Sequence, residues 1–284
     1  MRWEDRGQSP DVEDRRGARI GGGGLGRIGL GGFLLLAVLS IVFKQNFFAL
    51  LDTGGGGGTD VPVASAPASP EEQKLVSFVS FVLDDVQATW AREFEAMGRS
   101  YERSRLVLFT DATRSGCGYA EGAMGPFYCP ADQKVYIDLG FYQELKRRFG
   151  APGDFAQAYV LAHEVGHHVQ GLLGLETKLR SAQERNPGEA NALSVRFELQ
   201  ADCLAGLWAH STQQRDILEA GDVEEAMGAA AAVGDDRIQK QATGGVNPET
   251  WTHGSARQRT QWFNTGLQNG RIQSCDTFAS GAAD

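Results

Sequence analysis

The stretch that decides how this chain folds is Val160-Leu161-Ala162-His163-Glu164-Val165-Gly166-His167-His168-Val169. It is predicted to be helical, and it carries the pattern H-E-x-x-H. Two imidazoles four residues apart on an α-helix lie one turn apart on nearly the same face, so both can bind one metal ion. Glu164 lies off their line, where it can reach a water on the metal. The stretch therefore predicts a helix that supplies two zinc ligands, His163 and His167, and a general base.

A third ligand is needed, because a catalytic zinc usually has three protein ligands and keeps a fourth position for water. The metzincin continuation H-E-x-x-H-x-x-G-x-x-H is excluded, since Gln170 and Leu173 occupy its Gly and His positions. Glu198 is our candidate, because it follows His167 by 31 residues on a separate predicted helix. Asp202 lies four residues later on the same face, where it can accept a hydrogen bond from the non-ligating nitrogen of one histidine.

These two elements resemble the gluzincin pattern, in which H-E-x-x-H is followed by E-x-x-x-D. In this chain the elements are His163-Glu164-Val165-Gly166-His167 and Glu198-Leu199-Gln200-Ala201-Asp202. Together with Thr252-His253-Gly254 they are similar to the neutral zinc metallopeptidase family of bacteria, over about residues 71–279. The resemblance implies a zinc-dependent enzyme with protein or peptide substrates.

The chemistry expected of such a site is hydrolysis of a peptide bond by a metal-activated water. Zinc lowers the pKa of its water towards ~7, and Glu164 would take the proton and return it to the leaving amine. The tetrahedral intermediate also needs a donor opposite the metal. His253 and Arg259 are the candidates, because they resemble the downstream His and Arg segment of some membrane-associated gluzincins. The chain departs from that segment at Gly254, where those proteins often have proline.

The N-terminal region contains sixteen uncharged and mostly apolar residues, 28–43. As a helix they span about 24 Å, short of the ~30 Å hydrocarbon core unless residues up to Leu51 contribute. A cleaved secretory signal would need a small-residue cleavage site, which the residues after the run do not offer. We therefore expect an uncleaved transmembrane signal anchor, and the arginines before it place the N-terminus in the cytoplasm. The predicted location is the inner membrane, single-pass, with the catalytic domain in the periplasm.

Composition divides the chain into four segments: a disordered cytoplasmic tail at 1–27, the anchor at 28–51, a Gly/Pro-rich linker at 52–70 and the metallopeptidase domain at 71–279. The net charge of -9 argues against nucleic acid as a partner, since phosphate binding needs a basic surface.

Within the domain we expect an α+β, zincin-like fold. Hydrophobic spacing predicts a long helix at 71–97, the metal-binding helices at 155–173 and about 190–211, a surface excursion at 176–190, and further helices at 222–241 and 256–268. Strands at 106–110 and 134–139 suggest a small, mainly antiparallel sheet. We nominate 134–139 as the edge strand that receives the substrate backbone.

Four cysteines, Cys117, Cys129, Cys203 and Cys275, allow three pairings and are consistent with an oxidising compartment. Cys117 and Cys129 flank a Gly-rich loop, and a disulfide between them would offset the entropy of ordering it. We pair these two, which leaves Cys203 with Cys275. Four reduced, buried thiols are the alternative.

The rival to a membrane-anchored zinc endopeptidase is a membrane-tethered binding or scaffold protein with a structural or inactive zinc site. Glu164 and the spare coordination position favour the enzyme, because a closed structural site would normally recruit a fourth protein ligand.

Overall fold

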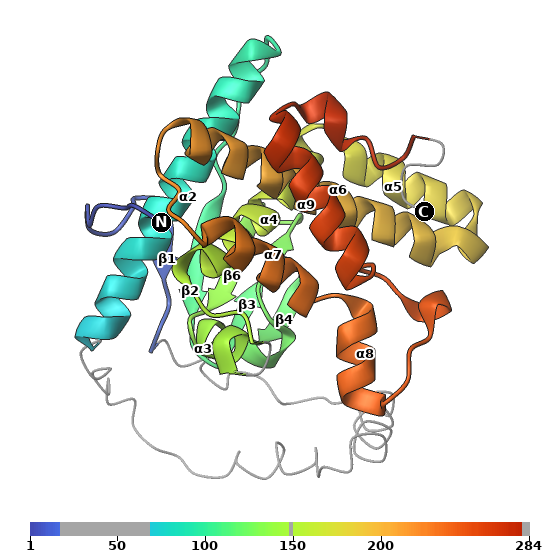
Figure 1. Ribbon diagram of the computed structural model, residues 1–284, viewed down its shortest axis with the longest axis horizontal. Coiled ribbons are helices and arrows are strands. Elements are labelled where there is room, and N and C mark those ends of the chain that lie inside the picture. The colour runs from blue at the N-terminus through green and yellow to red at the C-terminus, as the bar shows by residue number, and fades with distance from the viewer. Residues whose placement is uncertain (18–68, 148–149, 280–284) are drawn as a thin grey trace. The chain divides into compact units, whose positions relative to one another are not determined.

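The computed structural model describes residues 1–17, 69–147 and 150–279. It contains a mixed four-stranded sheet and the helices that pack on it (Figure 1). The strand order is β1-β2-β6-β5, and the strands are β1 (Val12–Asp14), β2 (Arg105–Phe109), β6 (Lys134–Asp138) and β5 (Phe127–Cys129). Both β1 and β6 run parallel to β2, whereas β5 is antiparallel to β6. The α+β class is as expected, but the prediction of a mainly antiparallel sheet is wrong.

The central strands are buried on both faces. Leu106 and Leu108 of β2 pack into the main core with the helices, while Val107 and Phe109 form a smaller cluster on the opposite face. A continuous apolar run is typical of a strand with parallel neighbours and two covered faces. Since β6 lies between β2 and β5, our nomination of 134–139 as the edge strand is wrong. The strand at that edge is β5.

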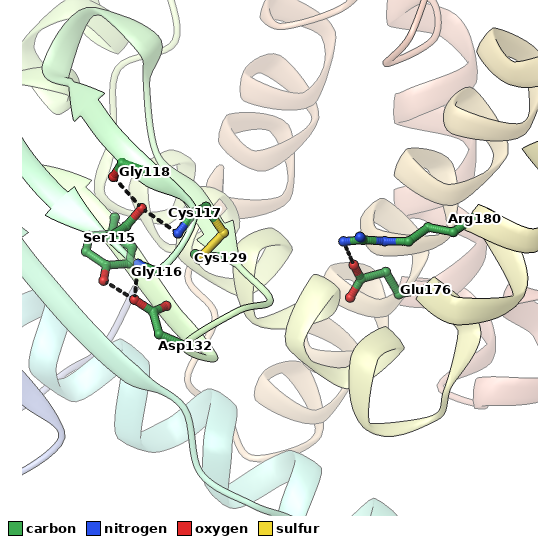
Figure 2. The surroundings of a disulfide bond; sticks show 9 residues. Ser115, Gly116, Cys117, Gly118, Cys129, Asp132, Glu176 and Arg180 are labelled. Carbon is green, nitrogen blue, oxygen red and sulfur yellow. Dashed lines mark hydrogen bonds and ion pairs between the residues drawn. A yellow bond between two sulfur atoms is a disulfide. The ribbon is translucent and has the colours of Figure 1, made fainter.

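A separate antiparallel hairpin, β3 (Ala112–Ser115) with β4 (Gly118–Glu121), precedes β5. The disulfide Cys117–Cys129 joins the tip of this hairpin to β5, as Figure 2 shows. Around it, the Gly116 amide donates to the Asp132 carboxylate at 2.6 Å. The Gly-rich loop between Cys117 and Cys129 is therefore held at both ends.

The N-terminal residues belong to the folded unit. Val12 of β1 pairs with Leu106 of β2, and the α-ammonium of Met1 lies 2.8 Å from Asp154 and 3.1 Å from Asp222. The prediction that residues 1–27 are a disordered tail is wrong for 1–17. A three-residue strand rich in charge has no periodicity of its own, and its pairing with β2 is what orders it.

The same contacts correct the membrane topology. We placed the tail and the domain on opposite sides of a membrane, but β1 is a strand of the domain's own sheet. Over the three described ranges, no helix combines the length and apolarity needed to cross a bilayer. The predicted anchor at 28–51 lies outside the described residues. The transmembrane part of the fold prediction and the single-pass inner-membrane location are both overturned by these findings.

The helices are α2 (Pro70–Ala96), α3 (Gly140–Arg147), α4 (Asp154–Leu172), α5 (Leu175–Arg185), α6 (Ala190–Gln214), α7 (Asp222–Ala232), α8 (Asp235–Thr243) and α9 (Ala256–Asn269). Ser69 caps α2 through a capping box with Glu72. The segment 176–190, predicted as a surface excursion, forms most of α5. The Ala-rich helix predicted at 222–241 breaks at Gly234, where a Cβ would lie 2.3 Å from the backbone nitrogen of Ala256.

Helix α4 packs against α6 and α7, and α6 packs against α9. Glycines permit the closest of these contacts. A Cβ on Gly206 of α6 would lie 2.0 Å from the Phe263 carbonyl, and one on Gly266 of α9 would lie 1.9 Å from the Cys203 carbonyl. The α6 and α9 backbones therefore touch, which fixes how side chains of α9 reach the metal-binding helices.

Candidate metal centre

His163 and His167 face Glu198 across the contact between α4 and α6. His163 Nε2 lies 3.3 Å from Glu198 Oε2, and His167 Nε2 lies 3.4 Å from Glu198 Oε1. The three ligand atoms all lie within 4.8 Å of one another. Ligand atoms held about 2.0–2.1 Å from a tetrahedral zinc are about 3.3–3.4 Å apart. The structure thus brings together the three predicted ligands at separations that fit this ion.

The other ring nitrogen of each histidine has a buried partner. His163 Nδ1 lies 2.9 Å from Asp202 Oδ1, and His167 Nδ1 lies 2.8 Å from Gln170 Oε1. Each acceptor favours a proton on Nδ1, which leaves the Nε2 lone pair directed at the metal position. Asp202 therefore lies where the sequence placed it, whereas Gln170 was missed, although its position three residues after His167 puts it on the same side of α4.

Charges around the ligands favour a cation between them. Burial lowers the pKa of His163, but Asp202 and Glu198 outweigh it and raise this pKa to about 10. Burial also raises the pKa of Glu198, but the two imidazoles hold it well below the usual range of a glutamate. The carboxylates thus stabilise positive charge at the imidazoles, which a proton or a divalent metal can provide.

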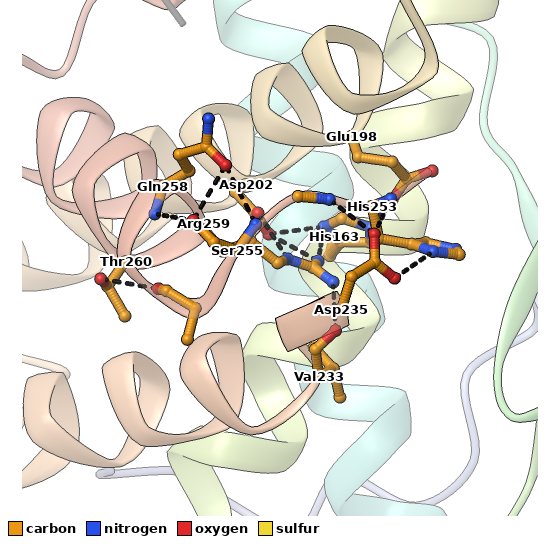
Figure 3. Close-up of polar contacts among 12 residues, drawn as sticks. His163, Glu198, Asp202, Val233, Asp235, His253, Ser255, Gln258, Arg259 and Thr260 are labelled. Carbon is orange, nitrogen blue, oxygen red and sulfur yellow. Dashed lines mark hydrogen bonds and ion pairs between the residues drawn. The ribbon is translucent and has the colours of Figure 1, made fainter. Parts of the chain in front are cut away.

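Arg259 lies behind the ligands, with only 4% of its surface exposed. Its Nε donates to Asp202 Oδ2 at 2.8 Å and its Nη2 to Asp202 Oδ1 at 3.0 Å, as Figure 3 shows. The Tyr159 hydroxyl also donates to Asp202, and Arg259 Nη1 donates to the Val233 carbonyl at 3.3 Å. Nε and Nη2 of the guanidinium are committed to Asp202 and Tyr159, so Arg259 orients the Asp202 carboxylate. The role of oxyanion donor that we predicted for Arg259 stays a prediction, and the geometry adds a supporting role through Asp202.

Tyr159 is a second residue that sequence reasoning missed. It lies one turn before His163 on α4, so the helical spacing contained the signal. Neither residue spacing nor composition shows that its hydroxyl, Asp202 and Arg259 form one buried cluster.

Glu164 and His253 both line a cleft of about 1150 Å³ that opens on the metal position. Glu164 is 8% exposed, on the same helix as two ligands. His253 enters from the loop before α9 with 53% of its side chain exposed. The Asp235 carboxylate holds this loop by accepting hydrogen bonds from the backbone amides of Thr252, His253 and Gly254 at 2.7–3.0 Å. Its carboxylate also raises the pKa of His253 through a hydrogen bond.

The far wall of the cleft comes from the hairpin, β5 and α3. Exposed carboxylates line it at Asp111, Glu121 and Glu144. Tyr119 and Met124 line the same wall with 57% and 70% of their surfaces exposed. The cleft therefore combines negative charge with exposed apolar side chains.

A histidine pair on one helix, a glutamate from a second helix and an open cleft with a further glutamate form a candidate H-E-x-x-H metal site. The family described as "Putative neutral zinc metallopeptidase" matches residues 1–278, and the chain belongs to that family. The match begins at residue 1 and not near 71, in agreement with the position of β1 in the domain.

The chain is similar to proteins of enteric and mycobacterial species. It is 48% identical over 287 residues to the uncharacterized protein YpfJ of Escherichia coli K12, covering 98% of this chain and 99% of that one. It is 47% identical over 208 residues to the uncharacterized protein Rv2575 of Mycobacterium tuberculosis H37Rv, covering 69% and 68%. No solved structure matches the chain.

Proposed function

We propose that this protein is a zinc-dependent endopeptidase whose ligands are His163, His167 and Glu198. The observation that supports it most is the triad of ligand atoms at zinc-like separations on the floor of an open cleft. When bound, zinc supplies a Lewis acid that activates a water and polarises the scissile carbonyl. The open cleft distinguishes the proposal from a structural zinc site, which is normally closed by a fourth protein ligand.

Glu164 would accept the proton of the attacking water and pass it to the leaving amine. Its neighbours on α4 are the ligands themselves, so the helix fixes its distance from the reacting atoms. His253 would donate to the developing oxyanion from the opposite side, because its loop is clamped by Asp235 beside the cleft. Arg259 would act only through Asp202.

The lining of the cleft favours an extended substrate segment with basic and apolar residues. Glu121 and Glu144 are exposed there, and Tyr119 and Met124 offer apolar contacts. Among the described residues that line the cleft, Arg259 is the only arginine, and it is neutralised by Asp202. Opposite charge in a cleft attracts such segments and speeds their association at low salt.

Turnover of an unstructured protein by wild type and by Glu164→Gln tests the proposal. Both proteins should bind one zinc per chain, and the variant should lose about 10²–10⁴-fold in kcat, because only the proton transfer is removed. Glu176→Gln, on α5 and outside the cleft, is the matched control and should retain full activity. Equal rates for wild type and Glu164→Gln on every substrate would refute the enzyme and leave a binding or scaffold protein.

A further inference from the structure

His167 is tied to the C-terminal segment by a chain of two buried glutamine amides. His167 Nδ1 lies 2.8 Å from Gln170 Oε1, and Gln170 Nε2 donates to Gln200 Oε1 at 2.9 Å. Gln200 Nε2 then donates to the Cys275 carbonyl at 3.0 Å. Gln170 is 0% exposed and Gln200 is 8% exposed. A buried glutamine amide is costly unless its donors and acceptor are paired, and this chain pairs them in one direction.

Two backbone carbonyls fix that direction. Gln170 Nε2 also donates to the Phe197 carbonyl at 2.8 Å, so this amide cannot turn its nitrogen towards His167 without losing that bond. The Cys275 carbonyl likewise fixes the Gln200 amide. Because a carbonyl only accepts hydrogen bonds, the Cys275 carbonyl sets the direction of every hydrogen bond in the series from Cys275 to His167. His167 Nδ1 therefore faces an acceptor, Gln170 Oε1. His167 must therefore present the Nε2 lone pair to the metal.

The outer end of the chain is itself anchored on α6. Cys275 is joined to Cys203 by a disulfide, and the Thr277 hydroxyl donates to the Arg196 carbonyl at 2.6 Å. Both anchors flank Glu198 on the same helix. The C-terminal segment is thus fastened to the helix that supplies the third ligand.

From this arrangement we infer that Gln170 and Gln200 are positioning residues for His167, and that the segment around Cys275 acts on the metal through them. His163 and His167 then have different supports. The first has a carboxylate, Asp202, and the second has a neutral amide chain. The inference rests on the zinc site of the proposed function, but it concerns metal affinity and ligand geometry and not proteolysis.

Zinc affinity, measured by competition with a chromophoric chelator, tests the inference on the full chain. Gln170→Met removes the acceptor of His167 and should weaken zinc binding by about 10–100-fold, the usual effect of losing a partner of a metal-binding histidine. Gln200→Met breaks the chain one bond farther out and should weaken it less, since the Phe197 carbonyl still holds Gln170.

A matched control is Gln183→Met, because the Gln183 amide donates to the Ala190 carbonyl and the Ser194 hydroxyl at the α5–α6 junction. It should leave zinc affinity unchanged. The d–d spectrum of the cobalt-substituted protein gives a second readout, and it should shift in Gln170→Met and not in the control. A merely structural role would lower thermal stability without this order of affinities.

The inference is overturned if Gln170→Met and Gln200→Met bind zinc within about twofold of wild type, or if the cobalt spectrum of Gln170→Met is the same as that of the control. If either methionine variant fails to fold, the zinc affinity and the cobalt spectrum of the other decide the question. A wild type that binds zinc but cleaves nothing refutes the proposed function alone. A wild type that binds no zinc refutes both.

Discussion

Replacing Arg259 by methionine separates a supporting role from a direct catalytic role. Arg259 is 4% exposed and its partner Asp202 is fully buried, with two hydrogen bonds of 2.8 and 3.0 Å between them. Removing one partner of a buried ion pair typically costs about 3–5 kcal/mol. Tyr159 and His163 still contact Asp202 in the variant, so we expect the lower end, about 3 kcal/mol in the free energy of unfolding. For a domain of this size that is about 6–12 °C in Tm.

The assay is thermal and urea unfolding of the metal-free protein, followed by turnover of the zinc-loaded protein at a temperature where both forms are folded. Arg257→Met is the control, because Arg257 is exposed on the same helix and should change stability by no more than about 0.5 kcal/mol. The zinc-loaded Arg259→Met protein should keep its activity within about tenfold of wild type. In our proposal Arg259 acts on the site only by orienting Asp202, and the loss of such an indirect partner has a moderate effect. A variant as stable as wild type that has lost about 10³-fold in kcat would refute this reasoning and restore Arg259 as the oxyanion donor.

Four further predictions concern the cleft and the second disulfide. His253→Gln should lower kcat about 10²–10³-fold with little change in zinc affinity. Since Asp235 raises the pKa of His253, His253 stays protonated to higher pH, and activity should fall as the pH rises through that raised pKa. In Asp235→Asn the basic limb of the plot of kcat/KM against pH should move to lower pH, towards ~6.5. A basic limb that does not move would contradict this prediction. Glu121→Lys should reduce the preference for Lys-containing over Glu-containing peptides, and the preference of wild type should weaken with salt; a salt-independent preference would contradict the charge argument. The double variant Cys203→Ala with Cys275→Ala opens a loop with a separation of 72 residues and should lose about 4 kcal/mol of unfolding free energy in urea titrations.

The residues of the candidate metal site could be predicted from the sequence because they depend on local geometry. His163 and His167 are set by one helix, and Glu198 with Asp202 by the period of another. Only the contact between α4 and α6 had to be assumed. That contact is close because Gly166 lies against Ala201, where a Cβ would be 3.1 Å from the carbonyl oxygen.

What the sequence could not supply is long-range pairing. Residues 12–14 form a strand only because β2 offers a partner, and a three-residue strand leaves no periodic signal. Strand β6 lies inside the sheet because it pairs with β2 on one side and with β5 on the other. The orientation of Arg259 depends on the glycine contacts between α6 and α9, which bring it against Asp202 at the base of the cleft.

The central claim is that His163, His167 and Glu198 hold one zinc ion and leave a position open to the cleft. An anomalous difference map at the zinc absorption edge, from crystals of the purified protein, tests it directly. We expect a single peak about 2.0–2.2 Å from Nε2 of both histidines and from a carboxylate oxygen of Glu198, with no fourth protein ligand. A peak elsewhere, or a fourth side chain closing the site, would contradict it.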